Sequence, residues 1–204
     1  MCGLFGALSF NASAINPEHA VRMSAHVARR GPDDKGEFFA GPVMLGHRRL
    51  AIIDLSASGH QPMHDVSQRY TIVFNGTIYN YPELREELIA KGYRFNSHSD
   101  TEVIINAYAC WGDACVERLH GMFAFVLHDE TAGRYLIARD PIGIIPLYYG
   151  FDDENRLFVA SEMKGLVGVC NVVSEFPPGH YWMSGDDQPT PYYQRPWQDF
   201  SSVE

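Results

Sequence analysis

The sequence has no long hydrophobic run and no cluster of positive charge. No apolar stretch approaches the roughly 20 residues of a membrane-spanning helix, and the first residues lack the charged and apolar regions of a secretory signal. No run of Lys or Arg exceeds two residues, and 25 acidic against 16 basic residues give a net charge of −9. Because phosphate neutralisation needs clustered cations, we expect no nucleic-acid partner. We expect a cytoplasmic protein without a membrane partner.

Motifs for phosphate, metal and serine chemistry are also missing. No glycine-rich loop runs into Lys-Ser or Lys-Thr, and nothing resembles the elbow that carries a nucleophilic serine. The four cysteines are Cys2, Cys110, Cys115 and Cys170, which we expect as free thiols in a reducing compartment. Cys110 and Cys115 have no second pair nearby, so we predict no metal site and no cofactor in this chain.

The chain has 204 residues, of which 46% are hydrophobic and 13% aromatic, enough for one domain with its own core. Strands and central helices follow one another without a regular βαβ alternation, so we predict an α+β fold with helices covering antiparallel sheets. The expected strands span residues 2–10, 36–40, 43–54, 70–74, 122–127, 135–138, 145–151 and 157–160. The expected helices span residues 17–29, 82–91, 100–108, 114–119 and 162–166. Residues 186–204 are expected to form an exit segment towards a further domain.

The N-terminal Met1-Cys2-Gly3 is the first candidate for chemistry. If Met1 is removed, Cys2 carries a thiol and a free α-amine on one Cα. An α-amine has a pKa of about 7.7–8.0, so near neutral pH it can accept the thiol proton as the sulfur attacks a carbonyl carbon. Nucleophile and base are then the same residue. Many chains carry Cys at position 2 without such a role, so Cys2 alone does not establish catalysis.

Catalysis by Cys2 makes demands on the rest of the sequence. Attack on an amide creates an oxyanion, which needs donors about 2.7–3.1 Å away, and a turn at Asn75-Gly76 would offer a side-chain amide and a backbone N–H. An amino-acid substrate also needs a cation for its carboxylate and an acid for its amine, and Arg49 and Asp100 are suitable types. Each residue has an ordinary alternative: a hairpin turn at Asn75-Gly76, and an ion pair or a helix cap for the charged pair.

Seven groups of residues resemble, in order, the motifs of the class II glutamine amidotransferase domain. They are Met1-Cys2-Gly3, Arg30-Gly31-Pro32-Asp33, His47 to Asp54, Asn75-Gly76 with Ile78-Tyr79-Asn80, Gly121 to Phe125, Ala138-Arg139-Asp140 with Gly143, and Ala160 to Lys164. Each group is weak alone, but the set is specific and covers essentially residues 1–200. Within the family, the chain looks most like the N-terminal glutaminase half of bacterial glutamine-hydrolysing asparagine synthetases.

The resemblance implies a fold and a reaction. Residues 1–204 would form one glutaminase domain with the fold of an N-terminal-nucleophile (Ntn) hydrolase, a four-layer αββα sandwich with two antiparallel sheets. Cys2 would attack the side-chain amide of glutamine and form a thioester. Asn75 and the N–H of Gly76 would form the oxyanion hole, and Arg30 would support the wall near the nucleophile.

The resemblance also implies how the substrate is held. Arg49 would bind the α-carboxylate of glutamine, and Asp100 would bind its α-amine with help from backbone groups around Ile52 and Ile53. At one position the chain departs from the family, which usually has Glu after Asn-Gly where this chain has Thr77. Loss of a charge-assisted hydrogen bond costs roughly 1.5–3 kcal/mol, so we expect weaker glutamine binding with the chemistry retained.

The ammonia that glutamine releases implies a partner. In the resembled synthetases, an ATP-pyrophosphatase domain with a Ser-Gly-Gly-x-Asp-Ser loop uses it, and that loop does not occur in this sequence. ATP and magnesium would therefore belong to a domain outside the chain. Two alternatives stay open: a glutaminase domain of a sugar-phosphate or ribosyl amidotransferase, and a weakly active or non-catalytic module of the same fold. Whether the protein forms a homo-oligomer is also left open.

Overall fold

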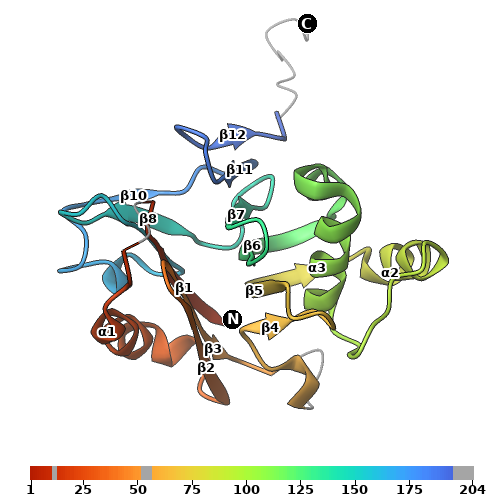
Figure 1. Ribbon diagram of the computed structural model, residues 1–204, viewed down its shortest axis with the longest axis horizontal. Coiled ribbons are helices and arrows are strands. Elements are labelled where there is room, and N and C mark those ends of the chain that lie inside the picture. Colours follow the sequence, from red (N-terminus) through yellow and green to blue (C-terminus); the bar gives the residue numbers. More distant parts are fainter. Residues whose placement is uncertain (11–12, 52–56, 195–204) are drawn as a thin grey trace, which may run out of the picture.

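The computed structural model describes residues 1–10, 13–51 and 57–194, and two antiparallel sheets stacked face to face form its centre (Figure 1). The first sheet has the order β10 (Val172–Glu175), β8 (Tyr148–Phe151), β9 (Leu157–Ala160), β1 (Gly3–Leu8), β3 (Val43–Arg49) and β2 (Asp34–Ala40). The second has the order β12 (Thr190–Pro191), β11 (His180–Met183), β7 (Arg134–Arg139), β6 (Gly121–Asp129), β5 (Tyr70–Ile78) and β4 (Met63–His64).

Helices cover the outer faces of both sheets, so the layers run helix, sheet, sheet, helix (Figure 1). The helix α1 (Pro17–Val27) packs on the first sheet, α3 (Asp100–Trp111) packs on the second, and α2 (Tyr81–Ala90) packs against α3. Four short 3₁₀ helices span Ala28–Arg30, Ala57–Gly59, Gly112–Arg118 and Met163–Gly165. The predicted αββα sandwich is confirmed.

Local sequence signals explain where the long helices begin. The side chain of Asn16 accepts a hydrogen bond from the N–H of Glu18 at 3.0 Å ahead of α1, and that of Ser99 accepts one from Thr101 at 3.2 Å ahead of α3. Such caps satisfy N–H groups that have no partner within the helix. The cap at Ser99 fixes the first turn of α3 and with it Asp100, one of the candidate site residues.

Several predicted boundaries were wrong. The strand expected over residues 43–54 ends at Arg49, and residues 52–56 lie outside the described residues. The strand expected from residue 145 begins at Tyr148, because the N–H of Ile145 donates to the carboxylate of Asp140 at 2.9 Å. The helix expected over 114–119 is a 3₁₀ helix.

The C-terminal part contains strands that were not predicted. Short strands β10, β11 and β12 follow residue 171, and β12 pairs with β11 through Tyr181 and Thr190. The segment expected to leave the domain over residues 186–204 therefore begins inside the second sheet, whereas residues 195–204 lie outside the described residues.

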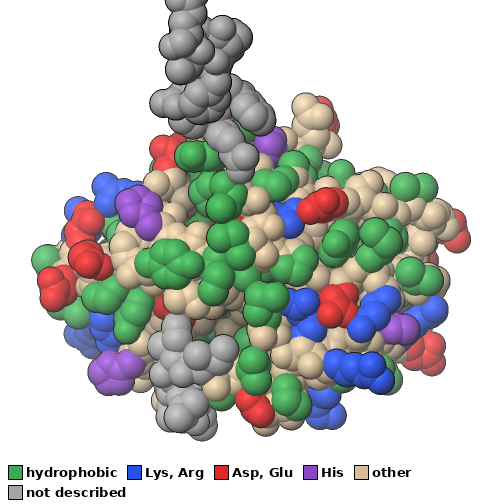
Figure 2. Space-filling model, turned by 180° about the vertical axis from the view of Figure 1, so that it is seen from behind, with side chains coloured by type: hydrophobic (Ala, Val, Ile, Leu, Met, Phe, Trp, Pro, Cys, Tyr) green, Lys and Arg blue, Asp and Glu red, His purple; other side chains and the backbone are tan. Residues whose placement is uncertain are grey.

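The surface mixes both signs of charge. Seen from behind, hydrophobic side chains are spread over the middle of the face, and positive and negative side chains lie together towards both ends (Figure 2). The net charge of −9 is therefore not gathered into one acidic area on this face. No helix among the described residues is long and apolar enough to cross a membrane.

Candidate active site

A pocket of about 100 Å³ lies beside the N-terminus. There, Cys2 ahead of β1 and Arg49 at the end of β3 face β5 of the second sheet. The N-terminus sits between the two sheets in Figure 1. The pocket is lined by Met1, Cys2, Arg49, Leu50, Gly59, Gln61, Phe74, Asn75, Gly76, Thr77, Ser99, Asp100, Thr101, Met122 and Ile145. Six of these were candidates from the sequence, and the fold brings them together from four separate segments: Cys2, Arg49, Asn75, Gly76, Thr77 and Asp100.

Three further candidates from the sequence are Ile52, Ile53 and Arg30. Ile52 and Ile53 lie outside the described residues, so their predicted role stays a prediction. Arg30 does not line the pocket, but its Nε donates to the carbonyl oxygen of Cys2 at 2.7 Å and so holds the backbone of the candidate nucleophile. The guanidinium also lies 3.4 Å from Glu162.

Gly31 lets the turn at residues 30–33 lie against the end of β3. A Cβ on Gly31 would stand 2.2 Å from the carbonyl oxygen of Arg48, closer than any real contact, so no side chain fits there. Beyond this contact, the N–H of Asp33 donates to the carbonyl of Arg49 at 3.0 Å, and its carboxylate accepts from the N–H of Ala51 at 2.9 Å. The turn therefore fixes the backbone that carries Arg49.

The thiol of Cys2 is held against the backbone of Leu50. The N–H of Leu50 donates to Sγ at 3.3 Å, and the S–H donates to the carbonyl of Leu50 at 3.5 Å. Burial raises the pKa of the Cys2 thiol, against the opposing effects of the Leu50 amide, the positive N-terminus and two nearby arginines. The thiol is therefore protonated at neutral pH and needs a base before it can attack.

The strand β5 presents one edge to the pocket. Alternate N–H groups of a strand point to the same side, and those of Tyr70, Phe74 and Ile78 point away from β6 to side-chain acceptors on Asp65, Gln61 and Asp100. The register of β5 with β6 runs without interruption from Tyr70 to Ile78. The N–H of Gly76 therefore points to the same edge, between the groups bound by Gln61 and Asp100.

Asn75-Gly76 is not a turn, so that part of the prediction was wrong. Both residues lie within β5, where they pair with Ala124 and Phe123 of β6. Gly76 has φ +148°, and a Cβ there would stand 2.1 Å from the carbonyl oxygen of Met122, so only glycine fits this strand. A side-chain amide and a backbone N–H still meet in the pocket, supplied by consecutive residues of a strand.

Asn75 has an unused donor. Its side-chain nitrogen Nδ2 is buried and has no hydrogen-bond partner among the described residues. Seven side chains of the described residues have such an atom, and Asn75 alone of these lines the pocket. Because a buried unpaired donor costs about 1–3 kcal/mol, its position in a pocket indicates that a ligand supplies the acceptor.

Arg49 and Asp100 place opposite charges in the wall of the pocket. Arg49 is the last residue of β3, and Asp100 is the first of α3; both side chains are buried. Burial raises the pKa of the Asp100 carboxyl, and hydrogen bonds from backbone N–H groups, led by that of Ile78, oppose the rise. A cation and a buried carboxylate in one small pocket suit the two charged groups of a free amino acid.

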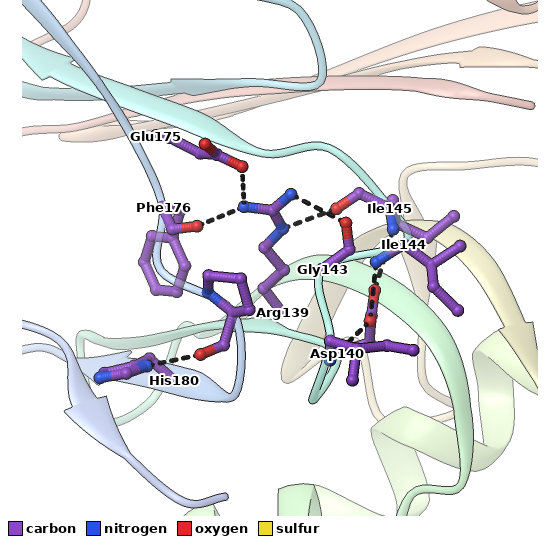
Figure 3. A network of polar contacts seen from close by, with 10 residues as sticks. Arg139, Asp140, Gly143, Ile144, Ile145, Glu175, Phe176 and His180 are labelled. Atoms are coloured by element: carbon purple, nitrogen blue, oxygen red, sulfur yellow. Dashed lines mark hydrogen bonds and ion pairs between the residues drawn. The ribbon is translucent and has the colours of Figure 1, made fainter. Parts of the chain in front are cut away.

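Ile145 was missed from the sequence, and the loop that carries it is fixed by a buried cation (Figure 3). The guanidinium of Arg139 donates to the carbonyls of Ile145 at 2.7 Å, Gly143 at 3.1 Å and Phe176, and it pairs with Glu175 at 2.7 Å. A cation inside the loop thus replaces the strand partners that this backbone lacks.

Asp140 holds the same loop from the other side (Figure 3). This fully buried carboxylate accepts four backbone hydrogen bonds, from Phe123, Ile142, Ile144 and Ile145, at 2.9–3.3 Å. Gln61 was missed as well, and it links two walls of the pocket. Among the described residues, no group of three His, Cys, Asp or Glu side chains could hold a metal ion.

Comparison with known proteins gives the family. A model of the glutamine amidotransferase domain matches residues 1–179. Asparagine synthetase B [glutamine-hydrolyzing] of Escherichia coli K12 is 41% identical over 204 residues, all of this chain and 36% of that protein. A probable asparagine synthetase [glutamine-hydrolyzing] of Dictyostelium discoideum is 38% identical over 97% of this chain and 36% of its own length. The chain thus spans about a third of the length of these relatives.

Solved structures of lower identity share the fold. Glutamine phosphoribosylpyrophosphate amidotransferase from B. subtilis superimposes with a TM-score of 0.76 at 22% identity, over 93% of this chain and 48% of that one. An allosteric regulatory enzyme of purine biosynthesis gives a TM-score of 0.80 at 22% identity, over 95% and 50%. The fold is that of an Ntn hydrolase, and this chain belongs to the family of class II glutamine amidotransferase domains, with the glutamine-hydrolysing asparagine synthetases among its relatives.

Proposed function

We propose that the chain hydrolyses the side-chain amide of glutamine, with Cys2 as the nucleophile once Met1 has been removed. The observation that carries the proposal is the convergence of Cys2, Asn75 and Gly76 in one pocket, with the Nδ2 donor of Asn75 buried and unpaired. Met1 also lines the pocket, and while it is attached the nitrogen of Cys2 is an amide and not a base. Its removal supplies the amine and opens space for substrate.

The first half of the reaction forms a thioester. The α-amine of Cys2 accepts the thiol proton as Sγ bonds to the amide carbon of glutamine, and the carbonyl electrons move onto oxygen. Asn75 Nδ2 and the N–H of Gly76 donate to that oxyanion. When the carbonyl reforms, the carbon–nitrogen bond breaks and the leaving nitrogen takes the proton from the Cys2 ammonium, so ammonia departs.

The second half releases glutamate. A water molecule gives a proton to the α-amine of Cys2 and attacks the thioester carbon, and the same two donors bind the second oxyanion. The carbon–sulfur bond then breaks, and the sulfur recovers its proton from the ammonium. Arg30 keeps the nucleophile in place through both halves, since it bonds the carbonyl of Cys2 at 2.7 Å.

The substrate is held by its amino-acid end. Arg49 binds the α-carboxylate and Asp100 the α-ammonium, with backbone groups of Ile52 and Ile53 as further partners. The hydroxyl of Thr77 can accept from the ammonium but adds no charge, so glutamine binds more weakly than it would to a site with a second carboxylate.

The ammonia is proposed to serve asparagine synthesis. The relatives named above are asparagine synthetases of which this chain spans about a third, so the remaining length would supply the synthetase domain, with its ATP and magnesium. The cytoplasmic location of this chain stays a prediction. Thr77 favours a second candidate, a weakly active or non-catalytic module of the same fold.

The decisive experiment measures ammonia and glutamate from glutamine. The protein lacking Met1, checked by N-terminal mass, is expected to release both in equal amounts. Cys2→Ala should release neither and yet unfold at the same temperature, because the change removes one sulfur from a partly exposed position. Glutamine hydrolysis by Cys2→Ala would contradict the assignment of the nucleophile. Absence of hydrolysis in the unaltered protein would favour the non-catalytic module.

A further inference from the structure

The edge of β5 that faces the pocket is covered by a strand along only part of its length. The partner β4 pairs with Thr71 and Ile72 and then ends. A backbone N–H left beyond that point inside the protein would cost free energy, so another group must accept from it. At Phe74 this group is Gln61, whose Oε1 accepts from the backbone N–H at 2.6 Å.

The other end of the same amide reaches α3. Nε2 of Gln61 donates to Oγ1 of Thr101 at 3.4 Å. Phe74 directly precedes Asn75, and Thr101 directly follows Asp100. One buried amide therefore joins the segment that carries the oxyanion donors to the segment that carries the amine acceptor, and both of its partners are also buried.

The distance between these two segments matters for the reaction. In glutamine, a short chain of bonds fixes how far the α-amine lies from the side-chain carbonyl. The two halves of the site must keep a matching separation, because an error of about 1 Å in such a site can cost on the order of 100-fold in rate. A hydrogen-bonded link between them sets that separation directly.

We infer that Gln61 is a positioning residue of the glutaminase site. It holds the oxyanion donors on β5 at a fixed separation from Asp100 at the start of α3. The inference rests on the proposed function. It assigns no contact with the reacting atoms to Gln61, which acts through Phe74 and Thr101.

A second side chain holds Phe74 and keeps the inference testable. Nε2 of His47 donates to the carbonyl oxygen of Phe74 at 3.0 Å, from the other sheet. Burial lowers the pKa of His47 to about 4, so the imidazole is neutral at the pH of the assay and this bond does not change. Because His47 still joins β5 to the first sheet, we expect a variant of Gln61 to fold.

The test compares three variants in the protein that lacks Met1. Gln61→Met keeps the length of the side chain and removes both hydrogen bonds. Thr101→Val removes only the link to α3, and Thr101→Ser keeps it. Asp65→Ala is the matched control, because Asp65 also caps an N–H on this edge of β5, that of Tyr70 at 2.7 Å, at the end away from the pocket. Ammonia release gives kcat and KM, and alkylation of Cys2 counts the competent sites.

Gln61→Met should lower kcat per competent site by roughly 10- to 100-fold and raise KM several-fold. Thr101→Val should raise KM more than it lowers kcat, because the oxyanion segment keeps its own bond to Gln61. Thr101→Ser keeps the hydroxyl, so kcat and KM should stay at their wild-type values. Asp65→Ala should unfold at lower temperature with both constants unchanged.

The inference is overturned if Gln61→Met lowers only the unfolding temperature or the number of competent sites, as Asp65→Ala does, while kcat per site and KM stay at wild-type values. It is also overturned if Thr101→Ser behaves like Thr101→Val, because the hydroxyl would then not be the partner that matters. Failure of the proposed function looks different: the unaltered protein itself would release no ammonia, and the inference would fall with it.

Discussion

Two buried polar clusters lie on either side of Ile145 and differ in how fully they are bonded. In the loop cluster, Arg139 and Asp140 bond to backbone groups on all sides (Figure 3). In the pocket, Asn75 keeps a buried side-chain donor without a partner among the described residues, and Gly76 lines the pocket at the edge of β5 that faces away from β6. Both clusters bury polar atoms, yet only the pocket leaves some of them for a ligand.

The comparison separates buried polar groups that are paired within the protein, and so stabilise the fold, from buried polar groups that are left unpaired for a ligand. A satisfied buried network stabilises one backbone conformation, whereas an unpaired group lowers stability until a ligand arrives. The loop cluster should therefore affect unfolding, and the pocket should affect catalysis. Each of the following changes tests that division, from the largest expected effect to the smallest.

Loss of Arg139 should have the largest effect, and it should be on stability. Arg139→Met leaves the buried carbonyls of Ile145 and Phe176 and the half-buried carbonyl of Gly143 unpaired, so we expect the free energy of unfolding to fall by about 3–5 kcal/mol in denaturant titrations. Glu175→Gln is the control: that carboxylate is 58% exposed, so the ion pair alone should contribute under about 1 kcal/mol. Equal losses in the two variants would mean that the ion pair, and not the carbonyls, carries the stability.

Loss of the amide at Asn75 should affect catalysis and spare the fold. Asn75→Ala is expected to lower kcat by roughly 100- to 1,000-fold, about 2.7–4 kcal/mol, because one oxyanion donor disappears. Its unfolding temperature should stay level or rise, since the change removes a buried unpaired donor. Steady-state ammonia release and thermal unfolding measure the two quantities. A large loss of stability with normal kcat would contradict the division, because Asn75 would then stabilise the fold and take no part in catalysis.

A carboxylate at position 77 should strengthen the binding of glutamine in the pocket. Thr77→Glu adds a charged acceptor near the substrate ammonium, so we expect KM for glutamine to fall about 10- to 100-fold, roughly 1.5–3 kcal/mol, with kcat nearly unchanged. Thr77→Gln adds similar bulk without the charge and should lower KM much less. A KM that rises or stays level in Thr77→Glu would show that the second carboxylate is not what this site lacks.

The smallest expected effect is the pH dependence that the Asp100 carboxyl gives to substrate binding. Burial raises its pKa, so its carboxylate is lost at a higher pH than for an ordinary Asp, and KM should rise correspondingly early as pH falls. For stability the sign is opposite: the contribution of Asp100 is greatest below its unfolded pKa and is lost as pH rises through the folded value. In Asp100→Asn, KM should no longer rise in this way as pH falls, which steady-state ammonia release over a series of pH values measures.

Most of the framework could be predicted because its signals are local. The cap at Ser99, the strand that starts behind Cys2 and the hairpin of β6 and β7 follow from neighbouring residues. Asn75-Gly76 was misjudged as a turn for the same reason. Such a pair strongly favours a hairpin turn, but here β6 pairs with β5 as far as Ile78 and keeps it extended.

The residues of the site also divide into those that could be predicted from the sequence and one that could not. Cys2, Arg49, Asn75, Gly76 and Asp100 were found from motifs of a known family, and the fold brings them to one pocket. Gln61 was not found, because a polar residue in a loop rich in Ser, Gly and Pro looks like one facing solvent. Its bonding partners lie 13 and 40 residues along the chain, and only folding brings them close.

An open strand edge is ordinarily a hazard, because it invites a strand of another molecule to pair with it and aggregate. On β5 the side chains of Gln61 and Asp100 occupy the places on both sides of Gly76, so no foreign strand can pair there. Gly76 itself lines the pocket between these two side chains. The side chains that block a foreign strand are thus the same ones that flank the proposed place of the substrate oxygen.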